Sequence, residues 1–107
     1  MNVFTALQFL QVNHQPLNQT NVVITDTDGK PDAILSELLA DVMGKIAIFG
    51  NLKAAGSPEG IVDQLRMFTP LHDDVLDEYQ KILEQDISGI NFAPQKNLVE
   101  FIYQPLL

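Results

Sequence analysis

The strongest constraint on the fold is an apolar stripe with helical spacing that runs through residues 31–49. Pro31 suits a first helical turn, Asp32 complements the helix dipole, and Gly50-Asn51 is a typical stop. The stripe consists of Ile34, Leu35, Leu38, Leu39, Val42, Met43, Ile46 and Phe49, and the opposite side carries Glu37, Asp41 and Lys45. This pattern predicts a long amphipathic helix. Gly44 within it costs about 1 kcal/mol relative to Ala, which suggests a close crossing with a second helix.

Two further helices are predicted by cap-and-proline pairs, Ser57-Pro58 and Thr69-Pro70. The apolar stripe of the first comprises Ile61, Val62, Leu65 and Phe68. That of the second comprises Leu71, Val75, Leu76, Tyr79, Ile82 and Leu83, and this helix is expected to end near Ser88-Gly89.

The remaining segments are less determined. Residues 1–12 fit a helix or a strand, 13–21 suggest a loop, and 22–25 suggest a short strand. Residues 97–103 fit either a short helix, which we favour, or an aromatic-rich strand. The predicted fold class is therefore mainly α. It is a small helical domain of four to five helices with room for one or two short strands near 22–25 and 98–103, and α+β is the alternative. The whole chain, 1–107, is expected to form a single globular domain.

The composition excludes several kinds of site. With no cysteine there is no disulfide, thiolate zinc site or cysteine nucleophile. Fourteen acidic residues against six isolated basic ones give a net charge of −8, which argues against nucleic acid and anionic membranes as partners. No stretch approaches the ~18 apolar residues of a membrane span, and the start of the chain lacks positive charge, so a cytoplasmic location is expected.

One segment has the form of a chemical motif. Residues 22–29, Val-Val-Ile-Thr-Asp-Thr-Asp-Gly, form an apolar run followed by Asp-x-Asp-Gly. The segment resembles the first motif of the haloacid-dehalogenase-type phosphotransferases, although Lys30 stands where that family usually has Thr. The resemblance implies that Asp26 is a nucleophile, that Asp28 is a general acid/base, and that both bind magnesium.

The same residues fit two other interpretations. They suit a plain polar turn, which we favour. An EF-hand loop would need ligands at Ile24 and Leu35, which cannot coordinate a cation, so only loose binding of magnesium or calcium by Asp26, Asp28 and Asp32 is open. No cofactor and no catalytic set are therefore expected. His72 beside Asp73 and Asp74 is likewise interpreted as an ordinary acidic first turn of a helix rather than a metal cluster.

Charge placement is the strongest distributed signal. Residues 57–86 hold eight acids and two bases, a net charge of −6. The candidate binding residues, called the acidic face below, are Glu59, Asp63, Asp73, Asp74, Asp77 and Glu78. They predict a small acidic helical binding or accessory protein of the inhibitor, immunity or assembly-factor type, with a protein partner for which a basic surface is the natural fit. The alternative function is magnesium-dependent phosphoryl transfer by Asp26 and Asp28.

Apolar residues near the end of the chain suggest a patch that closes the core or mediates self-association. They are Phe92, Phe101, Ile102, Tyr103, Leu106 and Leu107.

Overall fold

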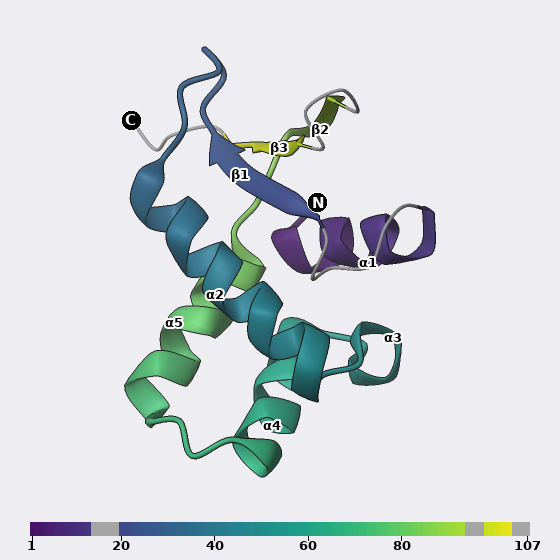
Figure 1. Ribbon diagram of the computed structural model, residues 1–107, viewed down its shortest axis with the longest axis vertical. Coiled ribbons are helices and arrows are strands. Elements are labelled where there is room, and N and C mark those ends of the chain that lie inside the picture. The colour runs from purple at the N-terminus through teal and green to yellow at the C-terminus, as the bar shows by residue number, and fades with distance from the viewer. Residues whose placement is uncertain (14–19, 94–97, 104–107) are drawn as a thin grey trace.

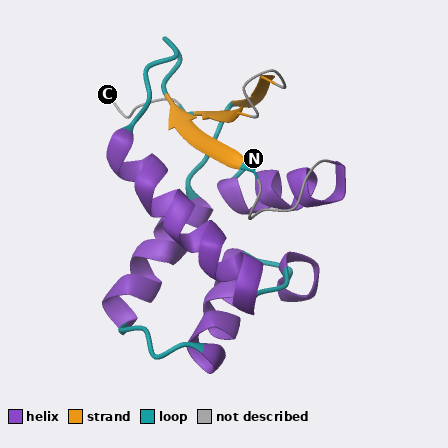
Figure 2. Ribbon diagram, viewed as in Figure 1, coloured by secondary structure: helices purple, strands orange, loops and turns teal. Residues whose placement is uncertain are grey.

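The computed structural model describes residues 1–13, 20–93 and 98–103, and these form five helices and a three-stranded sheet (Figures 1 and 2). In chain order the elements are α1 (Val3–Asn13), β1 (Asn21–Thr25), α2 (Ala33–Phe49), α3 (Leu52–Ala55), α4 (Pro58–Phe68), α5 (Asp73–Glu84), β2 (Gly89–Ala93) and β3 (Leu98–Ile102). The described part is mainly helical, in outline as predicted, and its small sheet also suits the α+β description.

The sheet has the strand order β1-β3-β2, in which β1 runs parallel and β2 antiparallel to β3. The parallel register pairs Val22 with Val99 and Ile24 with Phe101. All four of these side chains are buried, so one face of the sheet closes one end of the core. Helices α2 to α5 all lie in the connection between the two parallel strands.

Helix α2 links the sheet to the other helices. It extends from beside β1 to the opposite end of the molecule and contacts β1, α4 and α5 (Figure 1). Asp32 caps its first turn, because its carboxylate accepts the backbone N–H of Leu35 at 2.9 Å. The core combines buried residues from all layers, namely Val3, Phe4, Ala6, Leu7, Leu10, Val22, Ile24, Leu39, Val42, Met43, Ile46, Leu52, Ile61, Val62, Leu65, Leu76, Tyr79, Ile82, Leu83, Ile87, Val99 and Phe101.

The outer edge of β1 is covered by the beginning of α2. The N–H of Ile24 donates to Ser36 Oγ at 2.9 Å, and the carbonyl of Ile24 accepts from the N–H of Asp32 at 2.8 Å. Edge strands leave such groups available for pairing with another chain. At Ile24 this side of the sheet is therefore already closed.

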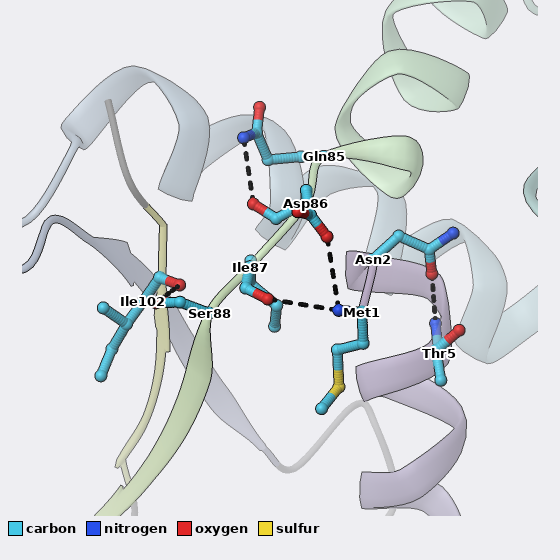
Figure 3. Close-up of polar contacts among 8 residues, drawn as sticks. All are labelled: Met1, Asn2, Thr5, Gln85, Asp86, Ile87, Ser88 and Ile102. Atoms are coloured by element: carbon cyan, nitrogen blue, oxygen red, sulfur yellow. Dashed lines mark hydrogen bonds and ion pairs between the residues drawn. The ribbon is translucent and has the colours of Figure 1, made fainter. Parts of the chain in front are cut away.

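Helix α1 is joined to the segment between α5 and β2 by backbone hydrogen bonds and by the α-amino group of Met1, whose contacts with Asp86 and Ile87 Figure 3 shows. The N–H of Val3 donates to the backbone carbonyl of Gln85 at 2.9 Å, and the N–H of Ile87 donates to the backbone carbonyl of Met1 at 2.8 Å. The α-amino group of Met1 lies 3.3 Å from a carboxylate oxygen of Asp86. The first segment, which fits a helix or a strand by pattern, is thus a helix whose first residues are tied to the chain after α5 and whose apolar side chains enter the core.

Several sequence predictions are wrong in detail. The helix favoured for 97–103 is absent, because Leu98–Ile102 pairs with both other strands as β3. Thr69 does not begin a helix but ends α4, where its hydroxyl donates to the carbonyl of Leu65 at 2.6 Å. Helix α5 begins at Asp73 and ends at Glu84, earlier than Ser88.

The predicted close crossing at Gly44 is also wrong. A Cβ added there would meet nothing within 4 Å, whereas one added at Gly60 would lie 2.2 Å from the carbonyl oxygen of Ala55. The close approach in this fold is therefore between α3 and α4. Sequence analysis did not predict α3 or β2.

Candidate functional site

The Asp26–Gly29 segment folds as a turn held by its own first carboxylate. Asp26 Oδ1 accepts the N–H groups of Asp28 and Lys30, both at 2.9 Å, and the carbonyl of Asp26 accepts the N–H of Gly29 at 3.0 Å. Gly29 has φ +81°, a left-handed conformation that glycine adopts readily. One oxygen of Asp26 is thus engaged in stabilising the loop, and Asp28 is exposed.

Asp26 follows β1 where that strand ends beside β3, but β1 is an edge strand of a mixed sheet. Nearby, Tyr103 Oη donates to Asp32 Oδ2 at 3.2 Å. Burial, the hydrogen bond to Asp32 and the negative charges of Asp32 and Asp26 all raise the pKa of Tyr103. Within 1–13, 20–93 and 98–103, no three His, Asp or Glu side chains gather as a metal site would require.

The residues of the acidic face are all exposed, on α4 and α5. Arg66 connects the two helices, since its Nη1 lies 3.1 Å from Asp63 and its Nε lies 3.7 Å from Asp73. Glu59 stands one helical turn before Asp63 on the same side of α4. The structure therefore joins Glu59, Asp63 and Asp73 into one continuous surface.

Helix α5 carries the rest of the acidic face. Its inward side holds Leu76, Tyr79, Ile82 and Leu83, which leaves its carboxylates in solvent. Asp77 follows Asp73 by one turn, and Glu78 likewise follows Asp74. Of these four residues, Glu78 alone forms an ion pair within α5, where its carboxylate lies 3.7 Å from Lys81 Nζ.

A shallow open depression of about 230 Å³ lies on this side of α5, lined by Asp77, Gln80, Lys81 and Glu84. Gln80 donates to Glu84 at 2.8 Å across it. Asp77 and Glu84 place two carboxylates along its length, two helical turns apart. The lining of the depression therefore combines two carboxylates with the ammonium group of Lys81 and the amide of Gln80.

Tyr79 connects α5 to α2 beneath this surface. Its side chain is buried, and its hydroxyl donates a hydrogen bond to Asp41. Burial first, and then this hydrogen bond, raise the pKa of Tyr79 above the ordinary value for a tyrosine. Lys45 lies 3.9 Å from the same Asp41 carboxylate group. The pairing holds α5, and with it four of the six residues of the acidic face, in place.

A group of exposed apolar side chains at the C-terminal ends of α2 and α4 was not predicted. It comprises Ile48 (75% exposed), Phe49 (39%), Met67 (76%) and Phe68 (60%), and it is called the apolar corner below. Phe49 and Phe68 were predicted to be buried. The exposure of Met67 and Ile48 could have been predicted from the sequence, because both residues lie off the apolar stripes of their helices.

The apolar residues predicted near the end of the chain divide between core and surface. Phe101 is fully buried, Ile102 and Tyr103 are half-buried, and Phe92 is 43% exposed. Leu106 and Leu107 lie outside the described residues. Phe101 thus closes the core, as one of the two predicted roles required.

The comparisons with known proteins give no relative: no family model matches the chain, and neither a curated protein nor a solved structure matches it significantly. No helix among the described residues has the length and apolar character needed to cross a membrane. The surface chemistry of this chain is therefore the basis for a functional proposal.

Proposed function

We propose that this protein is a binding or accessory protein that acts through contact between its acidic face and a basic surface of another protein. The observation that supports this most directly is the composition of α5. Over Asp73–Glu84 it carries five acids and one base, a net charge of −4, all on the side away from the core. Such an acidic surface suits an inhibitor, an immunity protein or an assembly factor.

The electrostatic field of the acidic face affects the rate at which a charged partner associates. A surface of one sign raises the encounter rate with a partner of opposite sign, and salt screens this effect over about 10 Å at 0.1 M. Arg66 and Lys81 neutralise Asp63, Asp73 and Glu78 only in part, since these are exposed ion pairs. Asp74 and Asp77 carry no ion pair with another described residue, and their charge is available to a partner.

The test begins with the full chain as bait and identification of the partner by mass spectrometry. Association and dissociation rates of the purified pair are then measured at low and at physiological salt. The variant Asp73→Asn/Asp74→Asn/Asp77→Asn is expected to slow association about tenfold at low salt and to change dissociation much less.

A matched control removes the same number of charges elsewhere on the chain. Asp28→Asn/Glu37→Gln/Glu100→Gln has the same net charge as the first variant, and none of the three residues lies in α4 or α5. Its association rate is expected to stay close to that of the unchanged protein. Equal losses in both variants, or an affinity that ignores both salt and the first variant, would contradict the proposal.

Magnesium-dependent phosphoryl transfer by Asp26 and Asp28 is the weaker alternative, because one Asp26 oxygen already accepts two backbone N–H groups. It requires magnesium-dependent turnover of a generic phosphate ester that Asp26→Asn abolishes. Absence of turnover with added magnesium would exclude phosphoryl transfer as the function.

A further inference from the structure

We propose that the apolar corner anchors the basic partner, and that the partner element bound there is an amphipathic helix with apolar residues on one side and Lys or Arg beside them. This inference rests on the proposed function, and it adds the chemistry of the partner and a second contact site to it.

The first step is that the two pairs of residues in the apolar corner lie at one place. The N–H of Asn51 donates to Gln64 Oε1 at 2.7 Å, so the chain just after α2 touches the middle of α4. Phe49 precedes Asn51 by two residues, and Phe68 follows Gln64 by one helical turn on the same side of α4. The end of α2 thus lies against α4 about one helical turn before Phe68, and the exposed apolar side chains of both helices belong to neighbouring segments.

The second step is that the apolar corner is continuous with the acidic face. Met67 follows Asp63 by one helical turn on the outer side of α4. Asp63 is joined through Arg66 to Asp73 at the first turn of α5. A partner that contacts Met67 thus has two carboxylates within reach along the same surface.

The charge of the chain decides which kind of partner fits the apolar corner. A second copy of this chain would bring its own acidic face, and its own net charge of −8, against the first, and like charges across an interface are unfavourable. A basic amphipathic helix meets both halves of the surface. Its apolar side covers Met67 and Phe68, residue types enriched in the cores of interfaces, and its cations meet Asp63 and Asp73. Flexible methionine adapts to the shape of such a helix.

The probe is a synthetic amphipathic helix of about five turns, ~18 residues, with leucine on one side and lysine on the other. A second peptide keeps every lysine and replaces each leucine by glutamine. Binding of both to the full chain is measured by fluorescence anisotropy. The leucine-bearing peptide is expected to bind at least about tenfold more tightly than the glutamine peptide.

The decisive variant is Met67→Ser/Phe68→Ser, which is expected to remove most of that difference and leave the salt dependence of binding unchanged. Ile34→Ser is the matched control, since Ile34 is 78% exposed but lies in the first turn of α2. It should leave both affinities as they are. Circular dichroism and thermal unfolding verify the fold of each variant, and Met67→Gln alone provides the milder change if the double variant does not fold.

Three results would overturn the inference, and they separate it from the proposed function. Equal binding of the two peptides that still weakens with salt and with the Asp73/Asp74/Asp77 variant would leave the acidic face standing and reject the apolar anchor. Loss of affinity in Ile34→Ser equal to that in the double variant would also reject it. A dimer in light scattering that Phe68→Ser dissociates would show that the occupant is a second copy.

Discussion

The carboxylates at the two ends of the molecule are used in opposite ways. At the sheet end, formed by the three strands and the start of α2, Asp26 and Asp32 accept backbone N–H groups of their own segments. At the helical end, formed by α4, α5 and the last turns of α2, the carboxylates of Asp74 and Asp77 are exposed and accept no hydrogen bond from another described residue. Identical side chains therefore stabilise the fold at one end and form the surface at the other.

The difference separates stability from function. Removing a carboxylate at the sheet end leaves backbone donors without a partner, which costs free energy of folding. Removing one at the helical end exchanges one solvated group for another, so its effect should appear in binding to a partner. The helical end is held together mainly by its buried apolar side chains and by the close backbone packing of α3 against α4.

The largest effect is expected from Gly60→Ala, which tests that packing directly. The added methyl group would lie 2.2 Å from the carbonyl oxygen of Ala55, and the first turn of α4 would have to move away from α3. We expect a loss of about 2–4 kcal/mol in the free energy of unfolding, measured by urea denaturation.

Gly44→Ala is the control for that change. Its Cβ would enter open space on the exposed side of α2, so the higher helix propensity of alanine should stabilise the protein by up to about 1 kcal/mol. If both variants changed stability by similar amounts, close packing would not distinguish α3 and α4 from the exposed side of α2.

The second largest effect is expected from Asp32→Ala, compared with Asp77→Ala. Asp32 accepts the N–H of Leu35 and the hydroxyl of Tyr103, and its removal should cost about 1–2 kcal/mol. Asp77 lies in solvent on α5, and its removal should change stability by less than about 0.5 kcal/mol. Equal losses in chemical denaturation would break the comparison between the two ends.

Sequence reasoning predicted the local parts of this fold. Helices α2 and α4 were found because an apolar period and nearby stop or cap residues, such as Ser57 with Pro58, lie within the segment itself. Thr69-Pro70 has the same form as Ser57-Pro58, yet Thr69 bonds backwards to Leu65 and ends α4. A cap-like residue can serve the helix before it as well as the one after it, and its own sequence does not decide which.

Strand β3 shows the limit set by distant contacts. Residues 97–103 fit a helix or a strand by pattern, and their state is decided by pairing with β1, more than 70 residues earlier in the chain. The pattern of either segment alone does not show which distant strand it pairs with. The strand β2 was also missed, although its partner β3 is the next element along the chain.

The candidate site divides in the same way. The acidic residues were evident from charge alone, but their union into one surface depends on Arg66 reaching from α4 to Asp73. Helical spacing could have predicted Ile48 and Met67 of the apolar corner, which lie off the apolar stripes, but not Phe68, which has the spacing of a buried residue. It lies in the last turn of α4, beyond the part that other elements cover, and spacing does not reveal where coverage stops.

The third prediction compares the two tyrosines in alkaline solution. In both, the pKa is raised in the folded state, so the folded protein holds the phenolic proton more tightly than the unfolded chain, which releases it near pH 10. This contribution is therefore complete below about pH 10 and is lost as the pH rises towards the raised pKa of the folded state. Tyr79 is buried, whereas Tyr103 is half-buried.

Tyr79→Phe should therefore reduce the alkaline loss of stability more than Tyr103→Phe does. It should also cost about 1 kcal/mol near neutral pH, because the hydrogen bond to Asp41 is gone. The measurement is urea denaturation of each variant between pH 7 and about pH 11. An identical alkaline slope in Tyr79→Phe and the unchanged protein would contradict the raised pKa.

The smallest effect is expected from Asp86→Asn, which removes the carboxylate beside the α-amino group of Met1 (Figure 3). Both partners are well exposed, at 44% and 88%, so the ion pair should contribute about 0.5 kcal/mol or less and vanish at high salt. The backbone bonds from Val3 to Gln85 and from Ile87 to Met1 remain in this variant and continue to hold α1. A salt-sensitive loss well above about 1 kcal/mol in urea denaturation would mean that charge rather than backbone pairing attaches α1. An exposed carboxylate would then contribute to stability as much as the hydrogen-bonded carboxylates of Asp26 and Asp32 do. Exposure would no longer distinguish the carboxylates that stabilise the fold from those that only form the surface.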